Sequence, residues 1–542
     1  MATTDHPADT YDGIIIGAGQ HGLILGTYLA RAGLRVLLVE RRLRHGGGLS
    51  TEERTLPGFQ HNLHSINHFS VTSTPWFRDL GLSARVRYLT PRYEFAQPHR
   101  DGSALVFSRD LDETLASIGR FSKADADTFR EWNAKAEEMT QRIFLRERFS
   151  EPLSPADRDE LLGRTALGRD FMELTRRQPG EVVEELFTDE RVKVLFLFKL
   201  SLFGTVLHET LGTHSPLGSL IRAFDLTTGY ELCAGGSWNL ARGLMEEFIA
   251  AGGHFVNQAH VERIVVEGGR ATGIELADGR SMRARQFVAS TLDLHQTLET
   301  LVGRDQLPAD YLARLDKFHY TGWTLFGLHL ALDEAPAYTS AAFDPHVNGA
   351  LKYNIGSETI ASLMAAHDDV DNGRVPANVQ FGAGALSVLD PSQAPPGKHT
   401  AYAWHVVPWA PDGDHENLRR MQGDMAASIM DRWREYAPNL TDATVLGSYT
   451  YTAYEYAQEL INMRHGDIFM GALSADQVLH NHFGYRTPLP NLYLAGSACH
   501  PNGAISGGAG YIAAGVIARD LGVEPWWQPM DARTELSRLG DG

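Results

Sequence analysis

The amino-terminal part of the chain carries the pattern that most restricts its fold: a strand, a glycine-rich turn and a helix. Residues 11–16 are rich in isoleucine, as in a buried strand, and run directly into the hexapeptide G-A-G-Q-H-G at 17–22. A helical pattern follows over 23–32, and a second apolar strand at 35–39 ends at Glu40. This order of elements predicts a βαβ unit that binds a nucleotide.

Each residue type in this unit has a physical role in holding a dinucleotide. Gly17 permits the tight turn, Gly19 lets the backbone approach a pyrophosphate, and Gly22 lets the helix pack closely on the strand. The free N–H groups and the positive dipole end of the helix are available to the phosphates. Glu40 lies 23 residues after Gly17, which places its carboxylate to accept hydrogen bonds from ribose hydroxyls.

The composition restricts the class of protein. A chain of 542 residues is too long for one ordinary core and is typical of two interleaved domains. The formal net charge of −18 argues against a nucleic-acid partner, which would need a basic surface. Two cysteines, Cys233 and Cys499, cannot build a disulfide framework or a thiolate metal site. Because the start of the chain is polar and has no signal-peptide pattern, we expect a cytoplasmic protein.

Two apolar segments bear on membranes and partner subunits. The most apolar stretch, 192–207, contains two lysines and is too short to span a bilayer. We expect a buried helix there; a peripheral membrane contact and the wall of a substrate channel are the alternatives. Trp526 and Trp527 are expected to pack on their own chain, with the anchoring of a second subunit in a homo-oligomer as the alternative.

Two further segments distinguish between nucleotide cofactors. Directly after the second strand, residues 41–50 read R-R-L-R-H-G-G-G-L-S, a basic loop whose glycines let the chain pass close to a long cofactor. Near the carboxyl end, a strand at 492–495 turns at Gly496 and Ser497, and glycines at 507–510 open an alanine-rich helix. In these segments the chain resembles the FAD-dependent phytoene desaturase-like superfamily of oxidoreductases, which contains carotenoid desaturases and isomerases and is related to the flavin amine oxidases.

The resemblance implies that FAD is the cofactor and that distant parts of the chain hold it. It implies an α/β fold in which a Rossmann-like FAD-binding domain of the GR2 type is interleaved with an α+β substrate domain. The FAD-binding segments are expected at 1–75, 225–300 and 468–530, and the substrate-binding segments at 76–224 and 301–467, before a tail at 531–542. The expected cofactor-binding residues are Gly17, Gly19, Gly22, Glu40, Arg41, Gly47, Gly48, Leu49, Val261, Gly496, Ser497, Gly507 and Gly508.

The middle of the chain contains a third part of the expected FAD domain. Ser237 is placed to cap a helix that carries an apolar face over 240–248. The resemblance puts the backbone near Val261 against the adenine. Strands joined by tight turns are expected at 261–267, 270–277 and 281–288. In the substrate domain, strand-like runs predict a sheet over the flavin at 324–332, 379–388 and 400–407.

Two groups of histidines are candidates for chemistry. His61, His64 and His68 are spaced H-x2-H-x3-H, but no cysteine or carboxylate supports a metal site, so no metal is predicted. The resemblance places this segment near the isoalloxazine, which leaves flavin-site lining and ordinary structural roles as the interpretations. Cys499 and His500 suggest a nucleophile and a base, although adjacent side chains point apart on most backbones. The catalytic residue is unknown, with His64 and His500 as candidates.

The resemblance implies an oxidoreductase that dehydrogenates (desaturates) or redox-isomerises an apolar or conjugated small molecule by hydride transfer to flavin N5. A flavin amine oxidase acting on a C–N bond is the first alternative, and a flavin-binding scaffold without turnover is the second. The substrate is expected to be apolar or aromatic, and the electron acceptor to be oxygen or a quinone. Because the sequence has no second glycine-rich βαβ unit, a tightly bound nicotinamide is not expected.

Overall fold

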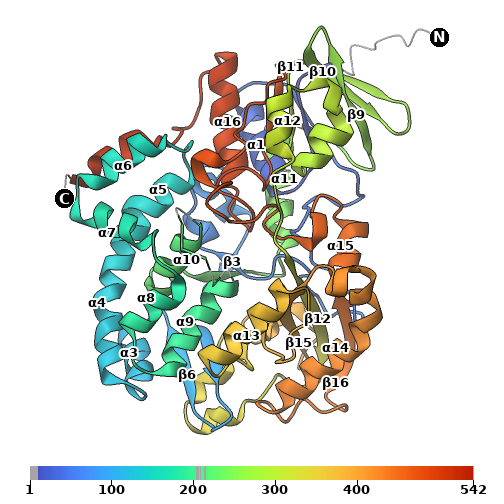
Figure 1. The fold of residues 1–542 in the computed structure, drawn as a ribbon. Coiled ribbons are helices and arrows are strands. Elements are labelled where there is room, and N and C mark those ends of the chain that lie inside the picture. The colour runs from blue at the N-terminus through green and yellow to red at the C-terminus, as the bar shows by residue number, and fades with distance from the viewer. Residues whose placement is uncertain (1–9, 203–206, 208, 213–214, 541–542) are drawn as a thin grey trace.

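The first sheet is built from three distant parts of the chain (Figure 1). The computed structural model describes residues 10–540 apart from 203–206, 208 and 213–214. Strand β1 (Thr10–Ile16) lies inside this sheet, parallel to β2 (Val36–Val39) on one side and to β11 (Ser281–Ser290) on the other. The strand order is β8-β2-β1-β11-β10-β9, and β17 also pairs with β11. The remaining strands are β8 (His254–Val256), β9 (Val261–Glu267), β10 (Arg270–Leu276) and β17 (Leu492–Leu494).

Three helices pack together against this sheet, and small residues allow their close approach. They are α1 (Gln20–Arg31), α11 (Trp238–Ala250) and α16 (Gly508–Leu521), as Figure 1 shows. At Gly26 of α1, a Cβ atom would lie 2.9 Å from the ring of Phe248 on α11, so only glycine lets these helices meet. Ile14 and Ile15 of β1 are fully buried, as expected for a parallel strand that is covered on both faces.

The second sheet has the strand order β16-β12-β15-β14-β13-β5-β6. Its longest pairing joins β12 (Trp323–Leu332) to β15 (His399–Pro408) in antiparallel register over their whole lengths. Helix α14 (Glu416–Arg434) covers part of it, with Trp433 fully buried in the same core. The other elements here are β5 (Tyr93–Pro98), β6 (Ala104–Ser108), β13 (Lys352–Ile355), β14 (Phe381–Gly384), β16 (Val445–Tyr451), α13 (Ile360–Asp371) and α15 (Ala453–Glu459). Helix α12 (Ala309–Leu315) instead packs with the core of the first sheet.

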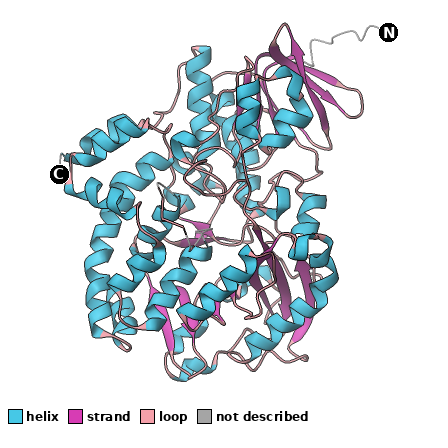
Figure 2. Cartoon of the chain, viewed as in Figure 1, coloured by secondary structure: helices cyan, strands magenta, loops and turns pink. Residues whose placement is uncertain are grey.

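A helical lobe and a small sheet complete the molecule (Figure 2). The small sheet places β7 (Tyr230–Cys233) between β3 (His68–Phe69) and β4 (Tyr88–Leu89). In the lobe, helices begin where Ser122 and Ser154 accept hydrogen bonds from backbone N–H groups three residues later, as normal N-caps do. The helices of the lobe are α3 (Leu111–Gly119), α4 (Lys123–Met139), α5 (Leu145–Arg148), α6 (Pro155–Gly163), α7 (Ala166–Leu174), α8 (Pro179–Leu186), α9 (Glu190–Leu202), α10 (Ser215–Phe224) and α17 (Ala532–Ser537). The short helix α2 (Pro75–Asp79) packs with the core of the first sheet.

The expected α/β fold, with a Rossmann-like sheet beside a mixed sheet and helices, is confirmed, but two local predictions are wrong. The run at 379–388 forms a strand only over Phe381–Gly384. Its pairing with β15 ends at Gly384 because the Ser387 hydroxyl then accepts the hydrogen bond of Thr400 N–H at 3.0 Å, in place of a backbone carbonyl. Ser237 does precede α11, but its hydroxyl donates to the Ser50 carbonyl (3.0 Å) and caps no helical N–H.

Both apolar segments pack on their own chain, although Trp526 remains 39% exposed. Residues 192–201 lie in α9, where Lys193 is half-buried and the others are buried. Residues 203–206 fall outside the part of the chain that the structure describes. Trp526 stacks on Tyr28 with ring centroids 5.2 Å apart, and Trp527 meets the same ring edge-on, so both pack on their own chain as expected. Among the described helices, none combines the length and the hydropathy that crossing a bilayer requires.

Candidate functional site

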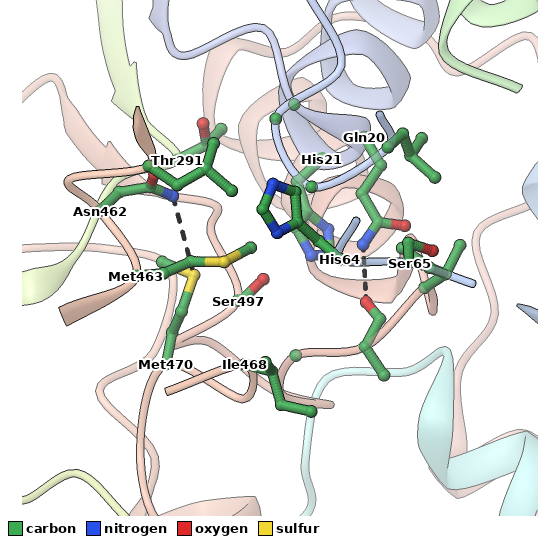
Figure 3. Close-up of a pocket in the computed structure, with 18 of the residues that line it drawn as sticks. Gln20, His21, His64, Ser65, Thr291, Asn462, Met463, Ile468, Met470 and Ser497 are labelled. Atoms are coloured by element: carbon green, nitrogen blue, oxygen red, sulfur yellow. Dashed lines mark hydrogen bonds between the residues drawn. The ribbon is translucent and has the colours of Figure 1, made fainter. Parts of the chain in front are cut away.

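A single cavity extends from the glycine turn of the first sheet to the second sheet. At one end its lining includes the turn after β1, Glu40 at the end of β2 and Val261 at the start of β9. At the other end it includes Lys352 of β13 and Trp404 of β15. Figure 3 shows the part between them, where His64 projects into the space between Gln20 and Ser497. Parts of the chain that are hundreds of residues apart therefore meet around one concave space, as at a ligand site.

The two glycine turns at the first end lie against each other. Gly19 forms an isolated bridge with Gly46, and a Cβ atom on Gly47 would lie 3.3 Å from the Gly19 Cα. Gly47 also has a φ of +58°, a conformation that side chains disfavour. Gly19 is the N-cap of helix α1, which has no side-chain cap and no acidic residue in its first turn. Its first N–H groups are therefore available to a bound anion.

The carboxylate of Glu40, at the end of β2, accepts hydrogen bonds from both glycine-containing turns. One oxygen accepts a hydrogen bond from Ala18 N–H at 3.1 Å, and the other accepts from Arg42 N–H at 2.9 Å. Each carboxylate oxygen can accept more than one hydrogen bond, so the group retains acceptor capacity toward the cavity that it lines.

The carboxy-terminal segment closes the cavity by close packing. A Cβ atom on Gly496 would lie 2.4 Å from the Thr291 carbonyl, and one on Gly507 would lie 2.4 Å from the indole nitrogen of Trp76. His21 joins the two ends of the chain, because its Nδ1 accepts from Gly510 N–H at 3.3 Å. Burial lowers the pKa of His21 to about 4, so the ring is neutral at physiological pH.

The structure brings most of the predicted cofactor-binding residues to this cavity. The predicted residues that line it are Gly17, Gly19, Glu40, Arg41, Gly47, Gly48, Leu49, Val261 and Ser497. Four glycines of the predicted set, Gly22, Gly496, Gly507 and Gly508, are not among the described lining residues. These glycines allow close packing behind the cavity wall. A Cβ atom on Gly22, for example, would lie 2.0 Å from the Gly17 carbonyl oxygen.

Several lining side chains carry buried polar atoms that no described group of the protein satisfies. They are Oε1 of Gln20, Nε2 of His21, both ring nitrogens of His64, Oδ1 of Asn67 and Oε1 of Gln296. Buried polar atoms in folded proteins are almost always hydrogen-bonded. A large polar ligand would satisfy such a set, and FAD, with its ring carbonyls, ring nitrogens and hydroxyls, fits it.

The three clustered histidines have separate surroundings. His61 hydrogen-bonds the Thr55 hydroxyl at 2.8 Å, and His68 hydrogen-bonds Ser65 at 2.8 Å. His64 lies between Tyr451 and Tyr456, and burial lowers its pKa to about 3. Within the described ranges, no three His, Cys, Asp or Glu side chains come together as metal ligands would.

Cys499 and His500 do not form a nucleophile–base pair. The Cys499 thiol lies 3.5 Å from the Gly484 carbonyl, and burial raises its pKa to about 12. His500 uses Nε2 to bond the Glu147 carbonyl at 2.9 Å and is absent from the described lining. Of the two candidate histidines, His64 therefore faces the cavity and His500 has a structural contact.

Sequence reasoning missed one large part of the wall and several inner residues. Residues between β16 and β17, from Glu459 to Leu473, line the cavity without any motif that would have revealed them. Asn462 and Met470 of this segment contact each other beside Met463 in Figure 3. Thr291 had a usable signal: it directly follows the strand next to β1, and its hydroxyl donates to the Ile16 carbonyl at 2.9 Å.

Known proteins resemble this chain over nearly its whole length. The profile of the flavin containing amine oxidoreductase family matches residues 22–517. A limonene dehydrogenase subunit of Castellaniella defragrans is 30% identical, and the match covers 96% of both chains. A lycopene-forming phytoene desaturase of Paracoccus sp. is 26% identical over 94% of this chain and 97% of its own. A solved putrescine oxidase, 14% identical, superimposes with a TM-score of 0.59 over 95% of this chain and 99% of its own, and shows the same fold.

The family match and the FAD-compatible cavity agree with each other, and relatives in this family are dehydrogenases and desaturases. The chain therefore belongs to the flavin containing amine oxidoreductase family and is an FAD-dependent oxidoreductase.

Proposed function

We propose that FAD lies along the cavity with its ADP half at the glycine turns and its flavin toward the second sheet. The uncapped start of α1 supports a position for the pyrophosphate at the glycine turns. Glu40 supports a position for the ribose, and Val261 supports a position for the adenine. Arg41, Gly47, Gly48, Leu49 and Ser497 continue the binding surface toward the flavin. On this basis segments 1–75, 225–300 and 468–530 form the cofactor domain, and 76–224 and 301–467 form the substrate domain.

We propose that the enzyme dehydrogenates an apolar small molecule bound beyond the flavin. The observation that carries this proposal is the continuity of the cavity, which reaches aromatic walls at Phe69, Tyr230 and Trp404. The rings of these side chains offer a large apolar surface to the body of a substrate. The names of the relatives, a limonene dehydrogenase and a phytoene desaturase, support an apolar substrate.

In this reaction the protein has two tasks, which are to position the substrate and to exclude water from the site. Bound FAD supplies the electron sink for hydride removal from a C–H bond. The aromatic walls hold the reacting carbon in place and keep water out. His64 is neutral at physiological pH because of its burial, so it can orient a ligand through one donor and one acceptor but adds no charge.

The alternatives differ in what they require of the cavity. An amine oxidase must admit an ammonium or amine group, but Arg148, Arg222 and Lys352 line the substrate end and disfavour a cation there. A scaffold without turnover would bind FAD that no substrate reduces. Redox isomerisation would use the same cavity, but it would start from reduced flavin and show no net oxidation.

Anaerobic substrate screening tests the proposal. The purified FAD-loaded protein is mixed with terpenes, conjugated alkenes and amines while the visible absorbance of the flavin is followed. We expect an apolar alkene or alkane to bleach the flavin and to lose two hydrogens by mass. If the screen is repeated with the flavin reduced beforehand, an unchanged product mass with altered double-bond geometry would assign isomerisation. Bleaching by amines alone would overturn the proposal in favour of C–N oxidation, and bleaching by no compound would favour the scaffold.

Glu40→Gln is expected to weaken FAD binding by about 10- to 100-fold, because hydrogen bonds to a charged acceptor contribute roughly 1.5–3 kcal/mol. The amide also turns a donor toward either Ala18 N–H or Arg42 N–H, both of which now donate to the carboxylate. Fluorescence titration of the apoprotein with FAD measures the change. Glu52→Gln is the control, because Glu52 is a nearby carboxylate that pairs with Arg54 at 2.7 Å outside the described lining. Equal FAD affinity in both variants would remove Glu40 from the proposed ribose site.

A further inference from the structure

The substrate end of the cavity contains three cationic side chains, which we call the inner cation cluster: Arg148 at the end of α5, Arg222 on α10 and Lys352 on β13. Lys352 is 4% exposed and Arg222 is 9% exposed, while Arg148 is partly open to the cavity. A hydrocarbon substrate would make no use of these charges. Their position among aromatic walls therefore needs a chemical explanation.

No acidic side chain of the described lining lies at this end. The described lining contains two acids, Glu40 and Glu459, and both lie at the nucleotide end. Glu40 binds the first glycine turn, and Glu459 pairs with Arg54 at 2.9 Å. No aspartate or glutamate occurs among the internal residues that the structure does not describe, which are 203–206, 208 and 213–214. The cluster therefore presents an excess of positive charge to whatever occupies the cavity.

Aromatic rings hold the three cations in place. Lys352 Nζ lies 3.9 Å from the ring centroid of Tyr230, and the Arg222 guanidinium lies 4.4 Å from that of Phe69. The Arg148 guanidinium lies 5.4 Å from the ring centroid of Phe144. Such contacts contribute roughly 0.5–2 kcal/mol each, whereas burial of a charge costs several kcal/mol. Burial accordingly lowers the pKa of Lys352 to about 7 and that of Arg148 to about 9.

Acids behind the wall offset part of this charge. Glu94 favours the charged form of Lys352 while Lys199 opposes it, and Asp225 favours the charged form of Arg222. Glu94 and Asp225 are themselves buried and are not among the described lining residues. The remaining excess of positive charge matches a ligand with a single negative charge better than a phosphate ester, whose charge is nearly double.

We propose that the inner cation cluster binds the carboxylate of the substrate, so that the substrate is an apolar carboxylic acid rather than a plain hydrocarbon. The arginine guanidinium groups match the geometry of a carboxylate, and the surrounding aromatic walls receive the apolar body. Charge pairing then fixes which carbon lies nearest the flavin. The inference rests on the proposed function and makes its substrate class specific.

Binding to the oxidised FAD-loaded enzyme tests this inference without turnover. Calorimetric titration compares 4-isopropylbenzoate with 4-isopropylbenzyl alcohol, and octanoate with octanol. We expect each acid to bind at least about tenfold more tightly than its alcohol. Equal affinity within each pair, or binding of no member, contradicts the inference. Because this comparison uses the unaltered protein, it stands even where a variant fails to fold.

Variants then locate the anion site. Lys352→Met and Arg148→Met are each expected to weaken acid binding by about 10- to 100-fold and to leave alcohol binding nearly unchanged. Lys199→Met is the matched control: Lys199 is a buried cation that contacts Ala223 outside the described lining, so the preference for acids should persist. Variants that shift the flavin midpoint potential but keep the full preference for acids would show that the cluster acts on the cofactor, which overturns the inference.

The two proposals fail in distinguishable ways. If the acids bind selectively but no compound reduces the flavin, the inference holds and dehydrogenation fails. If neutral hydrocarbons reduce the flavin and the acids show no preference, dehydrogenation holds and the carboxylate site fails.

Discussion

Gly22→Val is expected to lose most of its FAD. A Cβ atom at this position would lie 2.0 Å from the carbonyl oxygen of Gly17 and 3.3 Å from a methyl group of Leu38. The carbonyl belongs to the backbone of the turn itself, so relief requires the turn to open or α1 to move away from β1. Overpacking of a closed site costs about 1–3 kcal/mol, and at the upper end FAD binds roughly 100-fold more weakly.

The absorbance ratio of flavin to protein in the purified variant measures this loss, and titration with added FAD measures the affinity. Gly423→Val is the matched control, since Gly423 also lies inside a helix and its Cβ position has open space around it. That variant should keep its flavin. Circular dichroism separates loss of FAD from loss of fold. Full flavin occupancy in folded Gly22→Val would show that the turn tolerates a wider helix–strand spacing than the structure implies.

The nucleotide end of the site could be predicted because its determinants are local. Gly17, Gly22 and Glu40 lie within 24 residues of one another, and each is required by backbone geometry that follows directly from a strand, a turn and a helix. The predicted bounds of β1, α1 and β9 agree with the structure to within a few residues. Such segments carry their own periodicity and glycine pattern, so tertiary context changes them little.

The substrate end could not be predicted because its residues come from unrelated elements. Arg148, Arg222 and Lys352 lie on α5, α10 and β13, and none belongs to a motif. Their meeting depends on how the helical lobe packs against the second sheet, which local pattern does not encode. The run at 379–388 shows the same limit: its apolar pattern fits a strand, but a hydrogen bond from the distant Thr400 ends the pairing early.

Loss of Arg158 is expected to destabilise the folded protein strongly. Arg158 forms a two-pronged ion pair with Glu147, with Nε–Oε1 at 2.5 Å and Nη2–Oε2 at 3.0 Å. The two side chains are only 7% and 5% exposed. Arg158→Met would leave the Glu147 carboxylate buried without its partner, which costs about 3–5 kcal/mol of unfolding free energy.

Chemical denaturation of the FAD-loaded protein measures this cost. The double variant Glu147→Leu/Arg158→Met should recover most of the loss, because both charges are then absent from the buried site. Arg164→Met is the control: its pair with Glu160 is more than half exposed on both sides, and its removal should change stability by less than about 0.5 kcal/mol. If Arg158→Met is as stable as the wild type, water or a rearrangement must supply the hydrogen bonds that the Glu147 carboxylate loses.

The pH dependence of the same variant identifies the cause. In Arg158→Met the Glu147 carboxylate stays buried without its cation, and burial disfavours the charged form of a carboxyl group. The unpaired charge is present only while the carboxyl is ionised, so the stability deficit is largest near neutral pH. It should therefore shrink as the pH falls from about 7 to about 5, while the double variant shows no such change relative to the wild type. A deficit that is constant over this range would assign the loss to side-chain packing of Arg158 instead of charge burial.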